Sequence, residues 1–194
     1  MPEEFDLIVV GGGRASGLAT AAAKAGWRTA LIERDKLGGA CPNRGCVPSK
    51  LLIGFAEASR HVREADRHFI DAEWKGADLG KMFASVNDYI GGVDGRYEKR
   101  VEESGATLIR GEGRFVDNKV IAVGDRELTA DKIVVATGSR PTPPPYPELP
   151  VWTSDSLFPL ESKAPKSLLV IGGGFIGTEM AAFFAGVGTR TTLF

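Results

Sequence analysis

The sequence predicts a protein of the α/β class, with parallel strands at the centre of its sheets. Three observations support this prediction. A glycine-rich strand-turn-helix-strand pattern opens the chain and recurs near residue 194. Two stretches with helical spacing of apolar residues follow the first copy. Short alternating strands precede the second copy. Strands that alternate with helices in this order are typical of a sheet covered by helices.

The first copy is FDLIVVGGGRASGLATAAAKAGWRTALIE, residues 5–33. An apolar run leads into three glycines, an alanine-rich stretch favours a helix, and a second apolar run ends at Glu33. We therefore predict a strand, a tight turn, a helix and a second strand.

The middle of the chain supplies helices and then short strands. Residues 47–66 have helical spacing with Pro48 in the first turn, where its missing N–H costs nothing. A second helical region is predicted over residues 78–104, weakened in its middle by Gly91, Gly92 and Gly95. Residues 106–138 alternate and turn like a set of strands, and the proline-rich residues 141–150 predict an extended connection.

The second copy repeats the first, since LLVIGGG at residues 168–174 matches LIVVGGG at residues 7–13. Gly172, Gly174 and Gly177 complete the pattern G-x-G-x-x-G between a strand and a helix, where backbone N–H groups bind a diphosphate. The two copies together indicate two nucleotide sites, although either copy alone is also consistent with an ordinary tight turn.

The first glycine turn departs from this pattern at one place. Gly11 and Gly13 are present, but Ser16 occupies the third position, where it is small enough for close packing of helix and strand. Glu33 follows Gly13 by 20 residues at the end of the second strand, where a carboxylate binds ribose hydroxyls.

Composition excludes several classes of function. The net charge of −1 offers no basic surface for nucleic acid, and there is no run of 18 apolar residues for a membrane span. The acidic start MPEEFD does not resemble a signal peptide, so we expect a cytoplasmic protein without nucleic-acid or membrane partners. Stable structural disulfides are uncommon in that compartment.

Both cysteines of the chain, Cys41 and Cys46, lie in GGACPNRGCVPSK at residues 38–50. A zinc site needs about four ligands, which are usually cysteines and histidines. The only histidines of the chain are His61 and His68. Two inert buried thiols and a redox pair are the other interpretations. The redox pair is favoured because Cys46 precedes a predicted helix start, whose dipole stabilises a thiolate, and Lys50 adds positive charge.

The cysteine stretch resembles the GGTCxNxGCxPxK signature of the FAD-dependent pyridine nucleotide-disulfide oxidoreductases. The glycine turns, GEGRF at residues 111–115 and TADKIVVATGSRP at residues 129–141 agree with this family in the same order. The resemblance implies a Rossmann-like FAD-binding domain with a β-meander over residues 1–145. It also implies an incomplete Rossmann-like NAD(P)-binding domain over residues 150–194. Ala40 departs from the signature, which has threonine there.

The resemblance implies two sets of cofactor-binding residues. Those expected around FAD, with Glu33 at the adenosine ribose and Gly113 at the adenine, are Gly11, Gly13, Ser16, Glu33, Gly38, Gly39, Ala40, Cys41, Lys50, Gly113, Ala136, Thr137 and Gly138. Those expected around NAD or NADP are Gly172, Gly174, Phe175, Ile176 and Gly177.

The resemblance also implies the catalytic residues. Cys46 would face the flavin ring as a charge-transfer thiolate, and Cys41 would exchange with the substrate. Lys50 would lie near flavin N5 and pair with Glu179. No resident metal is implied, and neither His61 nor His68 is assigned as the acid-base catalyst.

The implied function is electron transfer between NAD(P)H, FAD, a disulfide of Cys41 with Cys46, and a small-molecule or lipoyl-type disulfide or dithiol. A dihydrolipoamide dehydrogenase-like activity is the first expectation, with mercuric, mycothione or glutathione reductase-like activities as alternatives. Because members of this family are longer and dimeric, we expect an N-terminal portion of a homodimeric enzyme, inactive in turnover by itself. A non-catalytic FAD-binding module is the alternative from another class, and a thioredoxin-like protein fits the cysteine spacing poorly.

Overall fold

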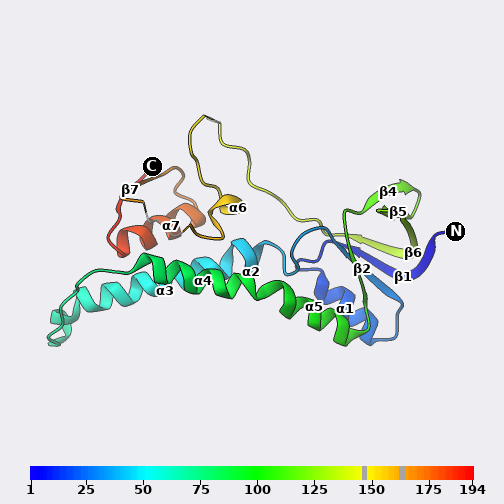
Figure 1. The fold of residues 1–194 in the computed structure, drawn as a ribbon, viewed down its shortest axis with the longest axis horizontal. Coiled ribbons are helices and arrows are strands. Elements are labelled where there is room, and N and C mark those ends of the chain that lie inside the picture. The colour runs from blue at the N-terminus through cyan, green and yellow to red at the C-terminus, as the bar shows by residue number, and fades with distance from the viewer. Residues whose placement is uncertain (146–147, 162–164) are drawn as a thin grey trace. The chain divides into compact units, whose positions relative to one another are not determined.

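The computed structural model describes residues 1–145, 148–161 and 165–194 of the chain (Figure 1). These residues form two compact units. Unit 1 consists of residues 1–43 and 91–140, and unit 2 consists of residues 44–90 and 141–194. Each unit has its own hydrophobic core.

Unit 1 is built on a six-stranded mixed sheet in the order β3-β2-β1-β6-β5-β4. The neighbours β3, β2, β1 and β6 are parallel, whereas β6, β5 and β4 form an antiparallel meander. The strands are β1 (Glu3–Val10), β2 (Thr29–Glu33), β3 (Thr107–Arg110), β4 (Arg114–Asp117), β5 (Val120–Val123) and β6 (Arg126–Val135). The predicted α/β fold with a meander is therefore confirmed.

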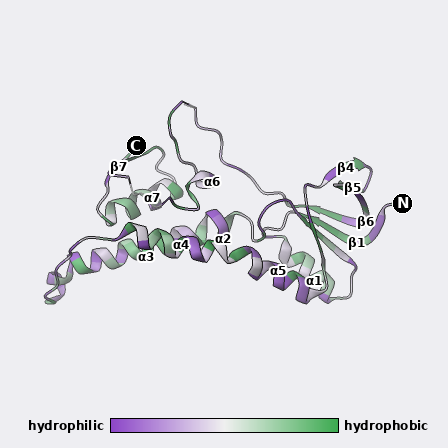
Figure 2. Ribbon diagram, viewed as in Figure 1, coloured by the Kyte–Doolittle hydropathy of each residue, from purple (hydrophilic) through white to green (hydrophobic). Residues whose placement is uncertain are grey.

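The apolar run of β1 is continuous because both of its faces are covered. Leu7 and Val9 join the core that includes residues of α1 (Ser16–Lys24) and α5 (Val93–Ser104). Ile8 and Val10 point the other way, into the core shared with β5 and β6. The last four residues of β1 are buried, which requires apolar side chains on both faces, whereas its first residues are more exposed. The strand accordingly changes from a hydrophilic start to a hydrophobic end (Figure 2).

Unit 2 contains the second strand-helix-strand pattern. The strands β7 (Ser167–Val170) and β8 (Arg190–Leu193) pair in parallel, and α7 (Phe175–Gly186) connects them in sequence, as the repeat predicts. Helix α7 packs on α3 (Cys46–Arg63), and α4 (Leu79–Gly91) contributes to the same core. Phe183 and Phe184 of α7 lie with ring centroids 4.9 Å apart, and Phe83 of α4 packs on both.

The helix boundaries follow local chemistry. Helix α3 begins at Cys46, one residue before the prediction, with Pro48 in its first turn. Helix α4 follows Asp78, whose carboxylate accepts the N–H of Lys81 at 3.0 Å. The single helical region predicted over residues 78–104 is two helices that end and begin on either side of Gly92. The short helices α2 (Ala40–Arg44), η1 (Ala65–His68) and α6 (Ser154–Leu157) were not anticipated by the sequence pattern.

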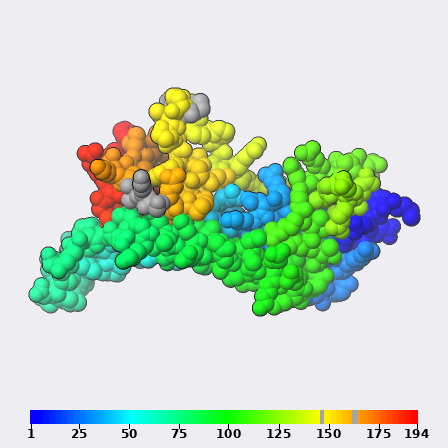
Figure 3. Space-filling model, in the orientation of Figure 1, coloured from blue at the N-terminus to red at the C-terminus, as the bar shows by residue number. Residues whose placement is uncertain are grey.

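The two compact units differ from the two predicted cofactor domains in the placement of residues 44–90, which group with residues 141–194. The assignment of residues 1–145 to FAD and 150–194 to NAD(P) concerns ligands and stays a prediction. In the predicted connection, residues 146–147 lie outside the described residues, and residues 142–143 and 148–150 are exposed. The colour bar assigns this part of the chain to the yellow region of the surface (Figure 3). Among the described residues, no helix combines the length and apolar character of a membrane span.

Candidate functional site

The first glycine turn lies at the carboxyl edge of the parallel strands of unit 1. Gly11 follows β1 directly and has a φ of +112°, which favours glycine. A Cβ at Gly11 would lie only 2.2 Å from the carbonyl oxygen of Ala136, the residue that follows β6. Ala136 in turn donates its N–H to the carbonyl of Val10 at 2.8 Å. The ends of β1 and β6 therefore approach each other through backbone atoms.

The glycine pair before the cysteines lies against this same turn. The N–H of Gly38 donates to the carbonyl of Gly12 at 2.8 Å. A Cβ at Gly39 would lie 2.8 Å from the Cα of Gly13, so Gly39 has no room for a larger residue. The segments around Gly13 and Gly39 thus form a narrow cradle lined by backbone.

Glu33 ties the end of β2 to the first glycine turn. One carboxylate oxygen accepts the N–H of Gly12 at 2.7 Å, and the other accepts the N–H of Asp35 at 2.8 Å. The side chain is only partly buried. The carboxylate therefore reaches back from β2 to the segment that carries Gly11 and Gly13.

The remaining residues predicted to bind FAD in unit 1 occupy nearby positions in the fold. A Cβ at Gly113 would contact Val10 and Ile32 at 3.4 Å, which places Gly113 over the ends of β1 and β2. Ser16 is buried at the start of α1, and Thr137 and Gly138 are exposed just after β6. Ala40 and Cys41 are exposed in α2, next to the cradle in sequence.

This edge fits a dinucleotide such as FAD. Open sheets bind ligands at the carboxyl edge where strand order reverses, which here is between β1 and β6. Backbone lined by glycine admits a diphosphate closely, and a carboxylate is the acceptor that ribose hydroxyls need. The resemblance implies that these residues lie around one cofactor, and the role of each residue toward FAD stays a prediction.

Unit 2 brings together three other predicted residues. Cys46 is the exposed first residue of α3, and Lys50 follows it by one helical turn. The ammonium group of Lys50 forms an ion pair and hydrogen bond with the carboxylate of Glu179 in α7. Hydrogen bonds from Lys50 and then from Ser49 lower the pKa of Glu179. The charged pair predicted from the resemblance is therefore present, although its relation to a flavin stays a prediction.

The second glycine turn shows the close packing that its sequence requires. Gly172 has a φ of +104° and donates its N–H to the carbonyl of Phe194 at 2.7 Å. A Cβ at Gly177 would lie 2.0 Å from the carbonyl oxygen of Gly172. Helix α7 begins with Phe175 and Ile176, which are 80% and 49% exposed. This first turn of α7 remains accessible in unit 2.

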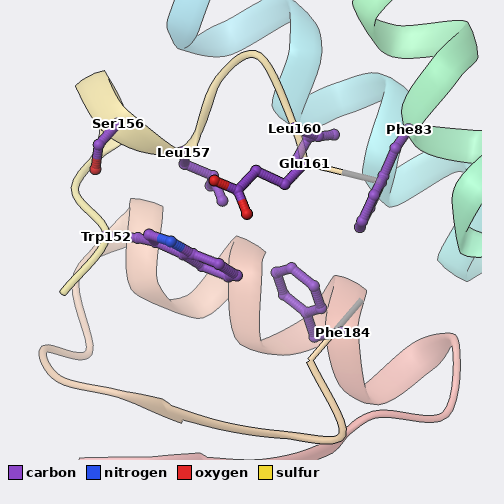
Figure 4. A pocket seen from close by; sticks show the side chains of 7 residues that line it. All are labelled: Phe83, Trp152, Ser156, Leu157, Leu160, Glu161 and Phe184. Atoms are coloured by element: carbon purple, nitrogen blue, oxygen red, sulfur yellow. The ribbon is translucent and has the colours of Figure 1, made fainter. Parts of the chain in front are cut away.

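A small hollow lies elsewhere in unit 2 (Figure 4). It is lined mainly by apolar side chains: Phe83, Trp152, Ser156, Leu157, Leu160, Glu161 and Phe184. None of the residues predicted to bind a cofactor lines it.

The sequence reasoning missed three residues that hold the cradle of unit 1: Asn43, Asp94 and Arg110. Asn43 belongs to the cysteine signature, which was a signal that it has a role, but the signature gives no reason for an amide. Asp94 and Arg110 lie 57 and 73 residues after Leu37, which they help to hold, and no local pattern reveals such contacts.

Known proteins resemble this chain over its whole length. At 36% identity, dihydrolipoyl dehydrogenase of Chlamydia pneumoniae matches 100% of this chain and 43% of its own length. Glutathione reductase of a Nostoc species is also 36% identical, over 99% of this chain and 42% of its own length. Mercuric reductase of Staphylococcus aureus is 33% identical over 98% of this chain. The chain thus spans less than half the length of these relatives.

Solved structures agree with this comparison. The HOCl-induced flavoprotein disulfide reductase RclA from Escherichia coli superposes with a TM-score of 0.82 at 29% sequence identity, over 97% of this chain and 41% of that chain. The family model of pyridine nucleotide-disulphide oxidoreductases matches residues 5–194. With the glycine turns and cysteine stretch placed as described above, the chain belongs to the pyridine nucleotide-disulphide oxidoreductase family.

Proposed function

We propose that the chain is the FAD-binding portion, with the start of the NAD(P)-binding portion, of a dithiol-disulfide oxidoreductase. The observation that supports this most strongly is the convergence of Gly11, Gly13, Gly39 and Ala136 at the carboxyl edge of one sheet. The same chain carries Cys41 and Cys46 directly after this cradle.

The cradle of unit 1 would hold FAD. The turn at Gly11 and Gly13 and the pair Gly38 and Gly39 would contact the diphosphate through backbone atoms. Glu33 would exchange one of its backbone hydrogen bonds for a ribose hydroxyl, since its carboxylate already faces this turn. FAD, once bound, supplies the redox chemistry that amino-acid side chains lack.

The two cysteines would carry out the exchange with substrate. The thiolate of Cys41 attacks one sulfur of the substrate disulfide, which forms a mixed disulfide and releases one substrate thiolate. The thiolate of Cys46 then attacks the sulfur of Cys41, forming the intrachain disulfide and releasing the second substrate thiolate. Cys46 is the first residue of α3, at the end of the helix where the dipole is positive.

In unit 2, the pair of Lys50 with Glu179 would hold a positive charge one turn from Cys46. The second glycine turn and the first turn of α7, with Phe175 and Ile176, would bind the diphosphate of NAD or NADP. These two roles follow from the resemblance and from the exposure of the residues.

The proposed substrate is a small-molecule or lipoyl-type disulfide or dithiol. A dihydrolipoamide dehydrogenase-like reaction is the first candidate, and reactions like those of mercuric, mycothione or glutathione reductases are alternatives. The named relatives of three kinds have 33–36% identity, which does not separate these substrates. We further propose that the whole protein is a cytoplasmic homodimer without nucleic-acid or membrane partners.

The proposal is tested by titrating the 194-residue chain with FAD and following flavin fluorescence. We expect saturation at one FAD per chain. When the disulfide of the FAD-bound protein is reduced and the flavin stays oxidised, the protein should show the long-wavelength absorbance of a thiolate beside flavin. This absorbance should be lost in Cys46→Ser and kept in Cys41→Ser. Absence of FAD binding would contradict the proposal.

The same experiment separates a second candidate, a non-catalytic FAD-binding module. Such a module would bind FAD with the same stoichiometry, but neither cysteine substitution would alter the flavin spectrum. The exposure of both cysteines favours the redox assignment over the module.

A further inference from the structure

Asn43 makes an arrangement of hydrogen bonds that requires an amide. The residue is 6% exposed, and its amide nitrogen donates to the carbonyls of Leu37 and Gly39, both at 2.9 Å. Carbonyl oxygens only accept hydrogen bonds, so the nitrogen and not the oxygen of the amide must face them. Among the described residues the amide oxygen is buried without a hydrogen-bond partner. An unsatisfied buried acceptor is unfavourable, so its cost must be offset by the two bonds that the amide nitrogen donates. These two bonds explain why asparagine occupies this position.

A second set of contacts holds the same segment, residues 37–39. The N–H of Leu37 donates to the carboxylate of Asp94 in α5 at 2.6 Å. Arg110, the last residue of β3, binds both oxygens of that carboxylate at 3.1 and 3.0 Å and donates to the carbonyl of Asp35 at 3.0 Å. Residues 35–39 are thus fixed from α2, from α5 and from β3.

The fixed segment connects the two features on which the proposed function depends, which are the cradle and Cys41. Residue 39 forms the cradle with Gly13, and Cys41 follows in the same helix, α2, as Asn43. A shift of residues 37–39 would therefore move the cradle and Cys41 together. Gly38 has no room for a side chain, because a Cβ there would lie 2.8 Å from Pro42 and 3.1 Å from Tyr97 and Val93.

We propose that Asn43 is a positioning residue that links the cysteine-bearing helix α2 to the diphosphate-binding cradle, with the Asp94 and Arg110 pair as its second support. This inference rests on the proposed FAD site. It predicts that FAD affinity depends on the hydrogen atoms that the Asn43 amide donates, and not only on the size or polarity of the side chain.

The first test is Asn43→Asp in the 194-residue chain, titrated with FAD. The carboxylate has nearly the shape of the amide but cannot donate, so we expect about tenfold weaker binding at about pH 8. The matched control is Asn87→Asp in unit 2, where the amide donates to the carbonyl of Leu160 at 2.8 Å. The control loses the same kind of bond and should bind FAD within about twofold of the wild type.

Acidification distinguishes hydrogen-bond donation from a general loss of structure. A buried carboxyl beside carbonyl oxygens has a raised pKa, and once protonated it donates one hydrogen bond. We therefore expect Asn43→Asp to recover affinity to within about threefold of wild type near pH 5.5. Asp94 and Arg110, which contact the same segment, keep their charges over this range, because the pKa of Asp94 is lowered and that of Arg110 is raised.

The second support is tested by Arg110→Lys, which keeps the charge but loses the two-pronged contact. We expect about fivefold weaker FAD binding. Arg126→Lys is the control, since Arg126 binds both oxygens of Glu3 at 2.8 Å at the opposite edge of the same sheet. Hydrogen exchange of the peptide over residues 34–43, measured without FAD, should accelerate in Asn43→Asp and Arg110→Lys and stay unchanged in both controls.

The outcomes separate this inference from the proposed function. If wild-type chain does not bind FAD, the proposed function fails, and the inference fails with it. If the wild type binds FAD and Asn43→Asp binds equally well, or does not recover in acid, the inference is overturned while the proposed function stands. Unchanged hydrogen exchange in Asn43→Asp would also overturn it.

Discussion

At the scale of single residues, Gly11 and Gly17 give opposite predictions for the same substitution. Gly11 has a positive φ and no room for a Cβ, whereas Gly17 lies in α1, where an added Cβ would meet no atom within 4 Å. Gly11→Ala should therefore lower the free energy of unfolding by about 3 kcal/mol. Gly17→Ala should raise it by about 0.5 kcal/mol, because alanine favours the helix. Urea unfolding of the two variants measures both values, and equal effects would contradict the geometry of the turn.

Glu33 is tied to the cradle by its carboxylate, whose two oxygens accept two backbone N–H groups. In Glu33→Gln one of these N–H groups would face an amide N–H instead of an acceptor. We expect FAD affinity to fall by about tenfold in a fluorescence titration. Glu103→Gln is the control, since Glu103 is exposed in α5, and equal affinities for the two variants would argue against a role for Glu33.

At the scale of elements, the pair of Asp94 with Arg110 joins α5 to β3 and predicts a dependence of stability on pH. Burial raises the pKa of Asp94, but hydrogen bonds from Arg110 and the N–H of Leu37 outweigh it, so the pKa is lowered. The folded protein then binds fewer protons than the unfolded chain between the folded pKa and an unfolded value of about 4. The stabilisation is present above that value and is lost as the pH falls through the folded pKa.

The variant Asp94→Asn removes this acid dependence. We expect it to be less stable than the wild type by about 1 kcal/mol at neutral pH, with the difference shrinking as the pH falls below about 4. Urea unfolding at a series of pH values measures the difference. Asp125→Asn, in the exposed turn between β5 and β6, is the control, and a constant difference at every pH would contradict the assignment.

The ion pair between α3 and α7 is a second contact between elements that a measurement can isolate. The side chain of Lys50 is 62% exposed and that of Glu179 is 28% exposed, so water and salt screen their attraction. A double-mutant cycle with Lys50→Met and Glu179→Gln should give a coupling of about 0.5 kcal/mol that falls as salt is added. A coupling of zero at low salt would mean that the pair adds nothing to the packing of the two helices.

Elements defined by a run of neighbouring residues could be predicted from the sequence. The end of β2 at Glu33, the start of α3 next to Pro48 and the break at Gly92 all follow from local residue types. The contacts of Asp94 and Arg110 could not be predicted, because they join distant segments through tertiary packing that no periodic pattern encodes. The contacts of Asn43 are local, but no residue pattern specifies which backbone carbonyls its amide binds. The helix α2 escaped prediction for a related reason, since it is five residues long and contains a proline.

At the scale of the whole molecule, the sequence predicted that the glycine-turn repeat is used twice, but not which helices accompany the second copy. Residues 44–90 precede the meander in sequence, yet they share a core with residues 141–194. The apolar face of α3 is defined by its spacing, whereas its partner, α7, lies more than 100 residues away. Local patterns thus indicate that a face will be buried without indicating against what.

Two units with separate cores predict two responses to FAD. Trp27 belongs to unit 1, whereas Trp74 and Trp152 belong to unit 2. A variant that keeps only Trp27 and one that keeps only Trp152, with phenylalanine at the other positions, therefore report the two units separately. Because the cradle lies in unit 1, FAD at about a hundred times its Kd should stabilise the unit that Trp27 reports by about 2.7 kcal/mol.

The unit reported by Trp152 should shift less, since the residues expected at the diphosphate and ribose of FAD are those of unit 1. Thermal unfolding followed by tryptophan fluorescence, with and without FAD, measures both midpoints. A larger shift for Trp152 would place the main FAD contacts in unit 2. Equal shifts at a single shared midpoint would mean that the two cores unfold as one, because a ligand that binds either part of a cooperative structure stabilises all of it.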